Sequence, residues 1–303
     1  MTSAFQLPPA LRPGDRVAVI APASGFERGA FEAGLAVISA RYRAEHSSGV
    51  FERQRYLAGS DARRLAELTA ALADPGIRAV FCARGGYGAT RLLSRLGTAG
   101  PVGPPKLLIG FSDITALHLW LQAHGRASVH GPVLTQLGRL PAATRTRLFD
   151  LLESSSAAAA LKGTTTYVGG AAEGPLLGGN LSVLTRMLGT PFMPALEGAI
   201  LLLEDQGERP YRLDRMWTHL QLAGVFARVR GIALGTFSAC EDPDAAYSSA
   251  DVLRELAASA GLPCAAGFPV GHGDVNEPVP LGVRVRLDAD TARLTFLEAA
   301  VSA

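Results

Sequence analysis

Short apolar runs alternate with amphipathic segments through the first half of the chain. Each run is continuous and closes at a turn, which is typical of a buried strand. Such strands are predicted at residues 16–21, 78–83, 106–111 and 128–130. Between them, amphipathic segments predict helices at residues 27–40, 61–74 and 113–125. This alternation predicts a mostly parallel sheet with helices on both faces, in which ligands collect at the carboxyl ends of the strands.

The second half has apolar runs of its own, and no repeat relates it to the first half. Strands are predicted there at residues 199–203, 231–237, 283–287 and 292–297. The last two runs are separated by a short turn at residues 288–291, which is typical of an antiparallel hairpin.

A change of composition separates the two halves. Residues 140–166 pass from a predicted helix into serine-, alanine- and threonine-rich sequence, which is typical of a linker. We therefore expect an N-terminal α/β domain at residues 1–140, a linker at 141–168 and a smaller C-terminal α/β domain at 169–303. The expected N-terminal fold is flavodoxin-like or class I amidotransferase-like.

Composition and charge exclude several classes of partner. The chain has 303 residues, of which 48% are apolar and 18% are charged, with a formal net charge of +2. No basic stripe or acidic tail is present, so nucleic acid is not an expected partner. The apolar runs are shorter than the ~20 residues that span a membrane, and the N-terminus has no signal-peptide pattern. We therefore expect no membrane partner and a cytoplasmic location.

The three cysteines, Cys82, Cys240 and Cys264, are far apart in the sequence. They lack the CxxC spacing of zinc sites, and their number and spacing do not fit a disulfide framework. We interpret them as small core residues of a protein from a reducing compartment. No metal site is expected.

Ser112 lies where a predicted strand ends and a predicted helix begins. A serine on such a turn points away from the sheet, beside the unpaired, electropositive N–H groups of the first helical turn. This is the logic of a nucleophile elbow, although the usual form is G-x-S-x-G and residue 114 here is isoleucine. The motif alone favours another role, that of a helix N-cap, because serine is a preferred N-cap residue.

A glycine-rich turn at residues 84–88 (RGGYG) follows another predicted strand. Glycines let the backbone approach a ligand closely with its N–H groups exposed. The turn lacks the Gly-Lys-Ser/Thr ending of a nucleotide-phosphate loop. From these residues alone, a plain turn and a ligand-binding turn are equally supported.

An acid and a histidine in the second half could complete a catalytic site. Glu204 and Asp205 directly follow the run at residues 199–203, where an acid either faces a site or forms an ordinary salt bridge. His272 lies between two glycines and is either a general base or a surface residue, with His130 as its main rival. The order serine, acid, histidine occurs in α/β-hydrolases, but triads recur in several orders.

Taken in order, the motifs resemble those of the LD-carboxypeptidases of serine peptidase family S66, which also includes the microcin C immunity hydrolases. No single motif is distinctive, but the ordered set is specific. The motifs are LRPGDRVAVIAP at 11–22, AGSD at 58–61, RGGYG at 84–88, GFSDIT at 110–115, HGP at 130–132, GPLLGGNLS at 174–182, LEDQGE at 203–208, GH at 271–272, Asn276 and PLG at 280–282.

The resemblance implies a catalytic triad and an oxyanion hole. The triad positions match Ser112, Glu204 and His272. The oxyanion donors match the backbone N–H groups of Gly86 and Asp113. No metal or organic cofactor is implied, and the family usually forms homodimers.

The resemblance also implies Asn180 and Ser182 as substrate contacts. Glu204 shares its acidic motif with Glu208, and alignment to the predicted strand end favours Glu204 as the triad acid.

The implied activity is hydrolysis of an L,D-peptide bond, which releases the terminal D-alanine of murein tetrapeptides in cell-wall recycling. The runner-up is a microcin C-type hydrolase of peptidyl or aminoacyl sulfamoyl-adenylates. That pocket would need an aromatic platform for adenine, and we interpret Trp120 and Trp217 as core residues. A non-catalytic small-ligand binding module predicts no covalent labelling of Ser112. An amidotransferase-like enzyme would need a cysteine at that position, whereas Cys82 lies inside a predicted strand.

Overall fold

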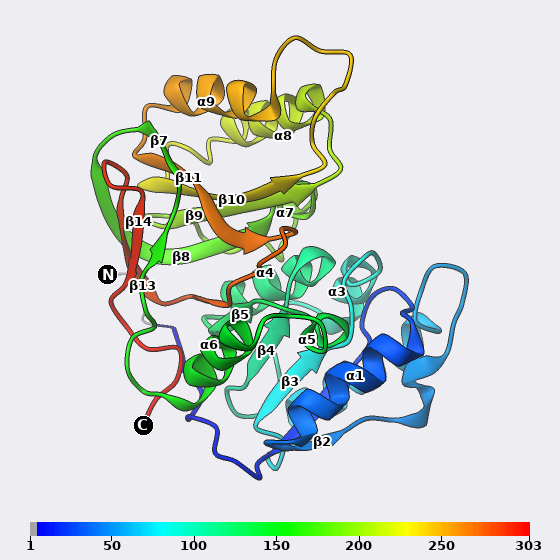
Figure 1. Ribbon diagram of the computed structural model, residues 1–303. Coiled ribbons are helices and arrows are strands. Elements are labelled where there is room, and N and C mark those ends of the chain that lie inside the picture. The colour runs from blue at the N-terminus through cyan, green and yellow to red at the C-terminus, as the bar shows by residue number, and fades with distance from the viewer. Residues whose placement is uncertain (1–4) are drawn as a thin grey trace.

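Two sheets organise the chain, one above the other in the view of Figure 1. The computed structural model describes residues 5–303. Both sheets contain parallel strands, and helices cover them, so the fold is mixed α/β, as the alternation of strands and helices predicts.

The first sheet carries most of the N-terminal half. Its strands, in spatial order, are β12 (Val279–Leu281), β5 (Ser128–His130), β4 (Leu107–Gly110), β3 (Ala79–Cys82), β1 (Arg16–Ile20) and β2 (Arg43–Glu45). The strands from β5 to β2 run parallel, and β12 pairs antiparallel with β5. The carboxyl ends of β3 and β4 therefore lie next to each other.

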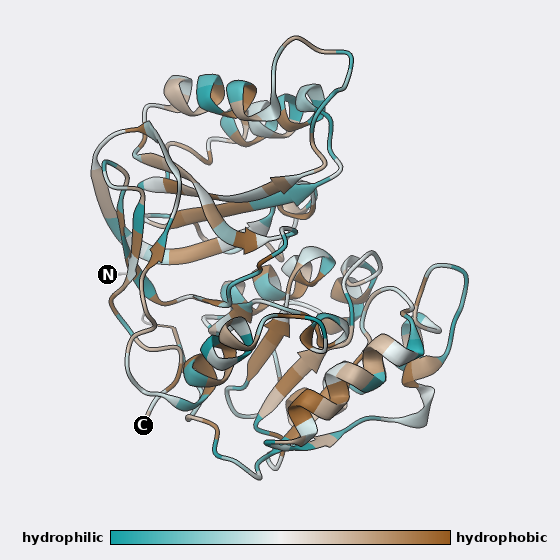
Figure 2. Cartoon of the chain, viewed as in Figure 1, coloured by the Kyte–Doolittle hydropathy of each residue, from teal (hydrophilic) through white to brown (hydrophobic). Residues whose placement is uncertain are grey.

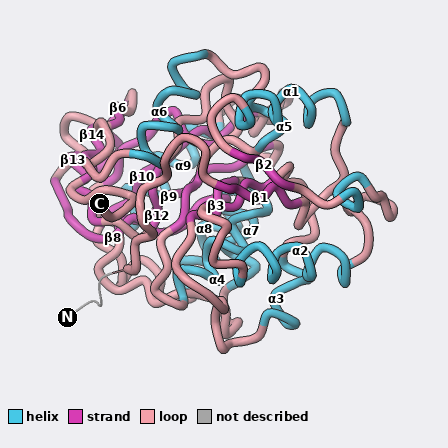
Figure 3. Tube along the Cα trace, turned by 90° about the horizontal axis from the view of Figure 1, so that it is seen from below, coloured by secondary structure: helices cyan, strands magenta, loops and turns pink. Residues whose placement is uncertain are grey.

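Helices cover both faces of the first sheet (Figure 3). One face carries α1 (Arg28–Ser39), α5 (Leu134–Leu137) and α6 (Ala142–Glu153). The other carries α2 (Asp61–Ala73), α3 (Thr90–Leu96) and α4 (Thr115–Ala123). Val17 and Val19 of β1 pack with the first set, whereas Ala18 and Ile20 pack with the second. Burial on both faces explains why these strands have continuous apolar sequences.

The second sheet is larger and curled. Its strands, in spatial order, are β6 (Leu161–Lys162), β14 (Arg293–Phe296), β13 (Arg284–Asp288), β8 (Ala171–Asn180), β9 (Ile200–Gln206), β10 (Gly231–Ser238), β11 (Cys264–Gly271) and β7 (Thr165–Val168). The strands from β8 to β11 run parallel, and those on either side are antiparallel. The parallel centre brings the carboxyl ends of its strands to one edge.

Three helices, α7 (Leu181–Met187), α8 (Pro210–Leu222) and α9 (Ser249–Ala260), pack on one face of the second sheet. Helix α4 packs against α7 and β8, at the junction of the two sheets (Figure 1). Trp120 of α4 and Trp217 of α8 belong to one hydrophobic cluster with Leu177 of β8, so the sheets share a core. Figure 2 shows hydrophobic residues concentrated along the strands of both sheets. No helix in residues 5–303 combines the length and apolar character needed to cross a membrane.

The predicted elements of the first sheet are confirmed, with ends shifted by a few residues. The hairpin at the end of the chain is also confirmed, as β13 paired antiparallel with β14. The helix expected at residues 113–125 instead begins as a short 3-10 helix, η2 (Ser112–Ile114), and continues as α4. Many observed elements are not predicted, namely η1 (Ser48–Phe51), β2, α3, α5, α7, α9, β6, β7, β8, β11 and β12.

The chain passes between the two sheets more than once. Residues 141–168, the expected linker, contain α6, which packs on the first sheet, and β7, which forms an edge of the second. Strand β12 returns from the second half to pair with β5 in the first sheet. The Ala10 N–H donates to the Ser302 carbonyl at 2.9 Å, so the two ends of the described chain also lie together.

Candidate active site

Ser112 is the first residue of η2, on the turn that follows β4, and its conformation costs free energy. Its φ is +65°, in the left-handed region that residues other than glycine rarely adopt. The N-cap residue of η2 is Phe111, and no side chain makes a cap hydrogen bond there. The interpretation of Ser112 as a helix cap is therefore wrong. A strained serine between a strand and a helix is the geometry of a nucleophile elbow.

The glycine loop, residues 84–88, follows β3 and lies beside Ser112. A Cβ on Gly85 would come within 2.8 Å of the Ser112 Cβ. Gly86 has a φ of +99°, and a Cβ there would lie 2.5 Å from the Ser24 Oγ. Only glycine permits this close approach of the loop to the turn.

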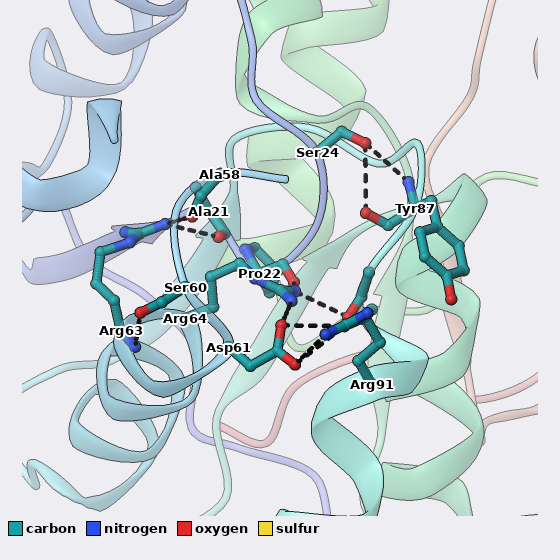
Figure 4. Close-up of polar contacts among 12 residues, drawn as sticks. Ala21, Pro22, Ser24, Ala58, Ser60, Asp61, Arg63, Arg64, Tyr87 and Arg91 are labelled. Carbon is teal, nitrogen blue, oxygen red and sulfur yellow. Dashed lines mark hydrogen bonds and ion pairs between the residues drawn. The ribbon is translucent and has the colours of Figure 1, made fainter. Parts of the chain in front are cut away.

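Ser24 holds the glycine loop in place. Its Oγ accepts the Tyr87 N–H at 3.0 Å, as Figure 4 shows, and its own N–H donates to the Gly85 carbonyl at 3.2 Å. Within residues 5–303, the N–H groups of Gly86 and Asp113 donate to no protein acceptor. Two free donors beside a serine could bind an anion. The sequence does not single out Ser24, because a lone serine after a strand has no distinguishing pattern.

Glu204 is fully buried and lies inside β9, not after it. The expectation that the strand ends before this acid is therefore wrong. Neighbouring glycines leave room for the carboxylate, since a Cβ on Gly271 would lie 2.4 Å from Oε2 and one on Gly235 would lie 3.1 Å from the Glu204 Cβ. A carboxylate can remain charged at such a position only if close partners compensate for the lost water.

His272 follows β11 directly and is one of those partners. Its Nδ1 lies 2.7 Å from Glu204 Oε2. Its ring centroid lies 4.7 Å from that of Phe111, the residue before Ser112. The structure thus brings the three sequence-predicted residues, Ser112, Glu204 and His272, into one region from two different sheets.

Burial and charge act in opposite directions on the pKa of His272. Burial is the largest single effect, and it lowers the pKa. The hydrogen bond and charge of Glu204 and the charge of Asp205 together raise the pKa by more than burial lowers it, so the net shift is upward. The loop that carries His272 is held at its start, because the Gly271 N–H donates to Asn276 Oδ1 at 2.8 Å. A histidine that donates Nδ1–H to a carboxylate presents Nε2 as a proton acceptor.

Asn180 connects the acid to the helix that follows Ser112. It is buried, and its Nδ2 donates to Glu204 Oε1 at 3.3 Å and to Asp205 Oδ1 at 3.0 Å. Its backbone N–H donates to Thr115 Oγ1, at the start of α4, at 3.0 Å. Ser182 Oγ donates to Asn180 Oδ1 at 2.8 Å. The protein thus already occupies these amide and hydroxyl groups, and substrate contact by Asn180 and Ser182 stays a prediction.

The rivals for each role lie in less suitable environments. His130 is fully buried, and burial holds its pKa well below the ordinary histidine value. Glu208 is half-buried and forms an ion pair with Arg212 at 3.4 Å. Burial also raises the pKa of the Cys82 thiol, which disfavours the thiolate that a cysteine nucleophile needs.

The cysteines Cys82, Cys240 and Cys264 are free and buried, which confirms their interpretation as core residues. Within the described part of the chain, no group of three or more histidine, cysteine, aspartate or glutamate side chains could hold a metal ion.

The chain matches one protein family over both sheets. Residues 17–131 match the LD-carboxypeptidase N-terminal domain, and residues 173–287 match the LD-carboxypeptidase C-terminal domain. The chain is 38% identical over 292 residues to the murein tetrapeptide carboxypeptidase of Pseudomonas aeruginosa, covering 92% of this chain and 94% of that relative.

Solved structures agree with this assignment. The muramoyltetrapeptide carboxypeptidase from Oxalobacter formigenes superposes with a TM-score of 0.82 at 30% identity, covering 93% of this chain and 97% of the other. The microcin C7 self immunity protein MccF superposes with a TM-score of 0.87 at 23% identity, covering 98% and 100%, a likeness that shows the fold alone. The chain therefore belongs to the LD-carboxypeptidase family, peptidase family S66, and is a hydrolase of the serine carboxypeptidase class.

Proposed function

We propose that the protein releases the terminal D-alanine of murein tetrapeptides in cell-wall recycling, with Ser112, His272 and Glu204 as its catalytic triad. The observation that carries the proposal is the 2.7 Å contact between His272 Nδ1 and Glu204 Oε2, beside a serine with a φ of +65°. The substrate is supported by the relatives from Pseudomonas aeruginosa and Oxalobacter formigenes, which are named for murein and muramoyl tetrapeptides.

In the first step, His272 Nε2 takes the proton of Ser112 Oγ as that oxygen attacks the carbonyl carbon of the L-residue. Glu204 accepts a hydrogen bond from Nδ1–H throughout, so it fixes the imidazole orientation and stabilises the imidazolium that forms, while the proton stays on the imidazole. Asn180 in turn fixes the Glu204 carboxylate through its side-chain amide.

The attack forms an ester C–O bond and a tetrahedral oxyanion. The Gly86 and Asp113 N–H groups donate to this oxyanion, and the loss of one such donor costs ~100-fold or more in turnover. Collapse of the intermediate breaks the peptide C–N bond, and His272 passes its proton to the departing amine of D-alanine. Water then gives a proton to His272 and attacks the ester carbonyl. The C–O bond to Ser112 breaks, His272 returns the proton to Ser112 Oγ, and the shortened peptide leaves with a free carboxyl group.

The muropeptide is favoured over a peptidyl or aminoacyl sulfamoyl-adenylate. Trp120 and Trp217 are 1% and 0% exposed, which confirms them as core residues and leaves neither ring free to stack on adenine. Purified protein given each substrate type at equal concentration distinguishes the two activities. Faster turnover of the sulfamoyl-adenylate would overturn the muropeptide proposal.

The direct test is D-alanine release from a murein tetrapeptide by the Ser112→Ala protein. A triad serine accounts for up to ~10⁶-fold of turnover, so release should become almost undetectable. The folded state should be at least as stable as in the wild type, since Ser112 makes no cap hydrogen bond. A variant that keeps a tenth of wild-type turnover would show that Ser112 is not the nucleophile.

Ser248→Ala is a matched control. Ser248 is a true N-cap, because its side chain accepts the Asp251 N–H at 3.1 Å at the start of α9. Removing such a cap typically costs ~1 kcal/mol of stability. This variant should therefore melt at a lower temperature with unchanged turnover, whereas Ser112→Ala loses turnover without a comparable change in melting.

We also propose a cytoplasmic homodimer. The cytoplasmic location is supported by the three buried cysteines, which remain free thiols. The homodimer is supported by the family resemblance. Light scattering on the purified protein measures its mass in solution, and a mass of one chain would overturn the dimer. Cell fractionation with an antibody against the protein tests the compartment, and recovery outside the cytoplasmic fraction would overturn that part.

A further inference from the structure

The glycine loop, residues 84–88, carries a proposed oxyanion donor but does little to fix its own shape. Gly86 and Gly88 have φ values of +99° and +130°, in a region where only glycine is unstrained. Glycine also has more backbone freedom to lose than any other residue. The position of the Gly86 N–H must therefore be set by groups outside the loop.

Arg64 of α2 holds the far end of the loop and is fully buried. Its Nη1 donates to the Gly88 carbonyl at 2.8 Å and also to the Pro22 carbonyl, after β1. Its Nη2 donates to Asp61, which also accepts bonds from Nε and Nη2 of Arg91, the shortest at 2.7 Å (Figure 4). A buried guanidinium is costly unless its donors are used. Here Nη1 and Nη2 are used, and Nη1 joins two loops, whereas Nε has no partner among residues 5–303.

Asp113 holds the chain directly after the loop, at Ala89, from the side of the nucleophile. Its Oδ2 accepts the Ala89 N–H at 2.7 Å in a buried position. Burial raises the pKa of this carboxyl to about 6, although the Ala89 and Gly88 backbone and the Arg64 charge act in the opposite direction. Asp113 directly follows Ser112, and its own N–H is the second proposed oxyanion donor.

We infer that Arg64 and Asp113 are positioning residues that set the separation of the two oxyanion donors. Asp113 ties the loop to the turn that carries Ser112, while Arg64 ties it to the loop after β1. Neither side chain makes a bond to the Ser112 hydroxyl. The inference rests on the proposed serine chemistry and adds what fixes its oxyanion hole.

The neighbouring Arg63 provides a matched control. It lies on the same helix, and its side chain is 12% exposed. It donates to the Ala21 and Ala58 carbonyls and pairs with Glu67 at 2.6 Å. None of these partners lies in the glycine loop. Figure 4 shows the Arg63 guanidinium at Ala21 and Ala58 and the Arg64 guanidinium at Pro22 and Asp61.

The experiment measures how fast a fluorophosphonate probe labels Ser112 in the Arg64→Met and Arg63→Met proteins. Labelling joins the serine oxygen to phosphorus and expels fluoride, and it needs the oxyanion hole but no murein peptide. We expect Arg64→Met to be labelled ~10–100-fold more slowly than the wild type, because a displacement of ~1 Å at a reacting centre can cost ~100-fold. Arg63→Met should stay close to the wild-type rate.

Turnover of the tetrapeptide gives a second measurement. An oxyanion donor acts in the transition state, so Arg64→Met should lower kcat and change KM little. Equal slowing in both arginine variants would show a merely structural role and overturn the inference. A raised KM with unchanged kcat would overturn it too.

Thermal melting shows whether Arg64→Met folds. If it does not, the Asp113 variants decide the question. Asp113→Ala removes the acceptor for the Ala89 N–H and should slow labelling, whereas Asp113→Asn keeps an acceptor oxygen and should restore part of the rate. The inference is overturned if Asp113→Ala is labelled as fast as the wild type, or if Asp113→Asn is labelled no faster than Asp113→Ala. A wild-type protein that is labelled but releases no D-alanine would instead refute the proposed substrate.

Discussion

Ser112 and Glu204 both hold states that cost free energy in isolation. A left-handed backbone at a residue other than glycine costs ~1–2 kcal/mol, and a buried carboxylate costs several times that unless it is paired. The surrounding fold offsets both costs through the glycine loop beside Ser112 and the bonds from His272 and Asn180 to Glu204. Such states persist mainly where function requires them.

The pH dependence of kcat/KM should report the pKa of His272. The general base is active when neutral, so activity is lost as the pH falls through this pKa. Because Glu204 and Asp205 raise the pKa above its ordinary value of 6.5, the acidic limb should have its midpoint above pH 6.5. Glu204→Gln removes the charge that raises the pKa, so its limb should move to lower pH along with a loss of kcat. An unshifted limb in Glu204→Gln would contradict this assignment.

Alanine variants of Glu204 and Glu208 should separate the two acids of one motif. Glu204→Ala leaves His272 without its carboxylate partner, and kcat should fall by ~10³–10⁴-fold, as when other triad acids are removed. Glu208→Ala breaks only the ion pair with Arg212, at 3.4 Å, and should keep most of the activity. Initial rates of D-alanine release measure both. The opposite ranking would assign the triad acid to Glu208.

Motif order predicts the chemical residue types of the site but not the residues that position them. Ser112, Glu204 and His272 can be named from the sequence because each lies in a short motif. Ser24 contacts Tyr87, which lies 63 residues further along the chain, and Arg64 contacts Pro22, which lies 42 residues earlier. No local pattern encodes such contacts, because they depend on how distant loops pack.

The carboxyl ends of β8, β9 and β11 in the second sheet shape the part of the site around Glu204. Gly271, at the end of β11, has a φ of +108°, and a Cβ there would lie 2.4 Å from Glu204 Oε2. Gly271→Ala should therefore displace the carboxylate and with it His272. We expect turnover to fall by ~100-fold, as for other ~1 Å misplacements, and the melting temperature to fall as well. Steady-state kinetics and thermal melting measure the two effects.

Gly224→Ala separates backbone strain from the clash. Gly224 has a φ of +70° and no heavy atom within 4 Å of a Cβ built there. Alanine should cost ~1–2 kcal/mol of stability through strain, with no effect on turnover. If both glycine variants kept full turnover, the close packing of Gly271 on Glu204 would not matter for catalysis.

Apolar periodicity predicts the strands that are buried on both faces but not those rich in glycine and proline. The first-sheet strands are continuous runs such as Leu107–Gly110. Strands β8 and β11 have the sequences AAEGPLLGGN and CAAGFPVG, which have the composition of turns. Their glycines allow close packing of neighbouring segments. For example, a Cβ built on Gly179 would lie 2.7 Å from Thr115 Oγ1. Tertiary contacts of this kind override the local preference of these sequences for turns.

The residues of the candidate site come together only where the two sheets meet. Ser112 and the glycine loop come from the first sheet, whereas Glu204 and His272 come from the second. The Asn180 N–H donates to Thr115 Oγ1 across this junction, and β12 pairs with β5. The division into domains at residues 1–140 and 169–303 stays a prediction. Neither range alone contains all strands of its sheet, because β12 belongs to the first sheet and β6 and β7 lie before residue 169.

We expect the whole chain to unfold in one cooperative transition. Trp120 lies on α4 beside the first sheet and Trp217 lies on α8 over the second, and both belong to one hydrophobic cluster. Melting of either half would therefore expose apolar surface of the other, which couples the two. Trp120→Phe and Trp217→Phe each leave a single tryptophan as a reporter, because the chain has 2 tryptophans. Within each variant, fluorescence and circular dichroism should give the same midpoint in denaturant, and two separated midpoints would show that the halves unfold independently.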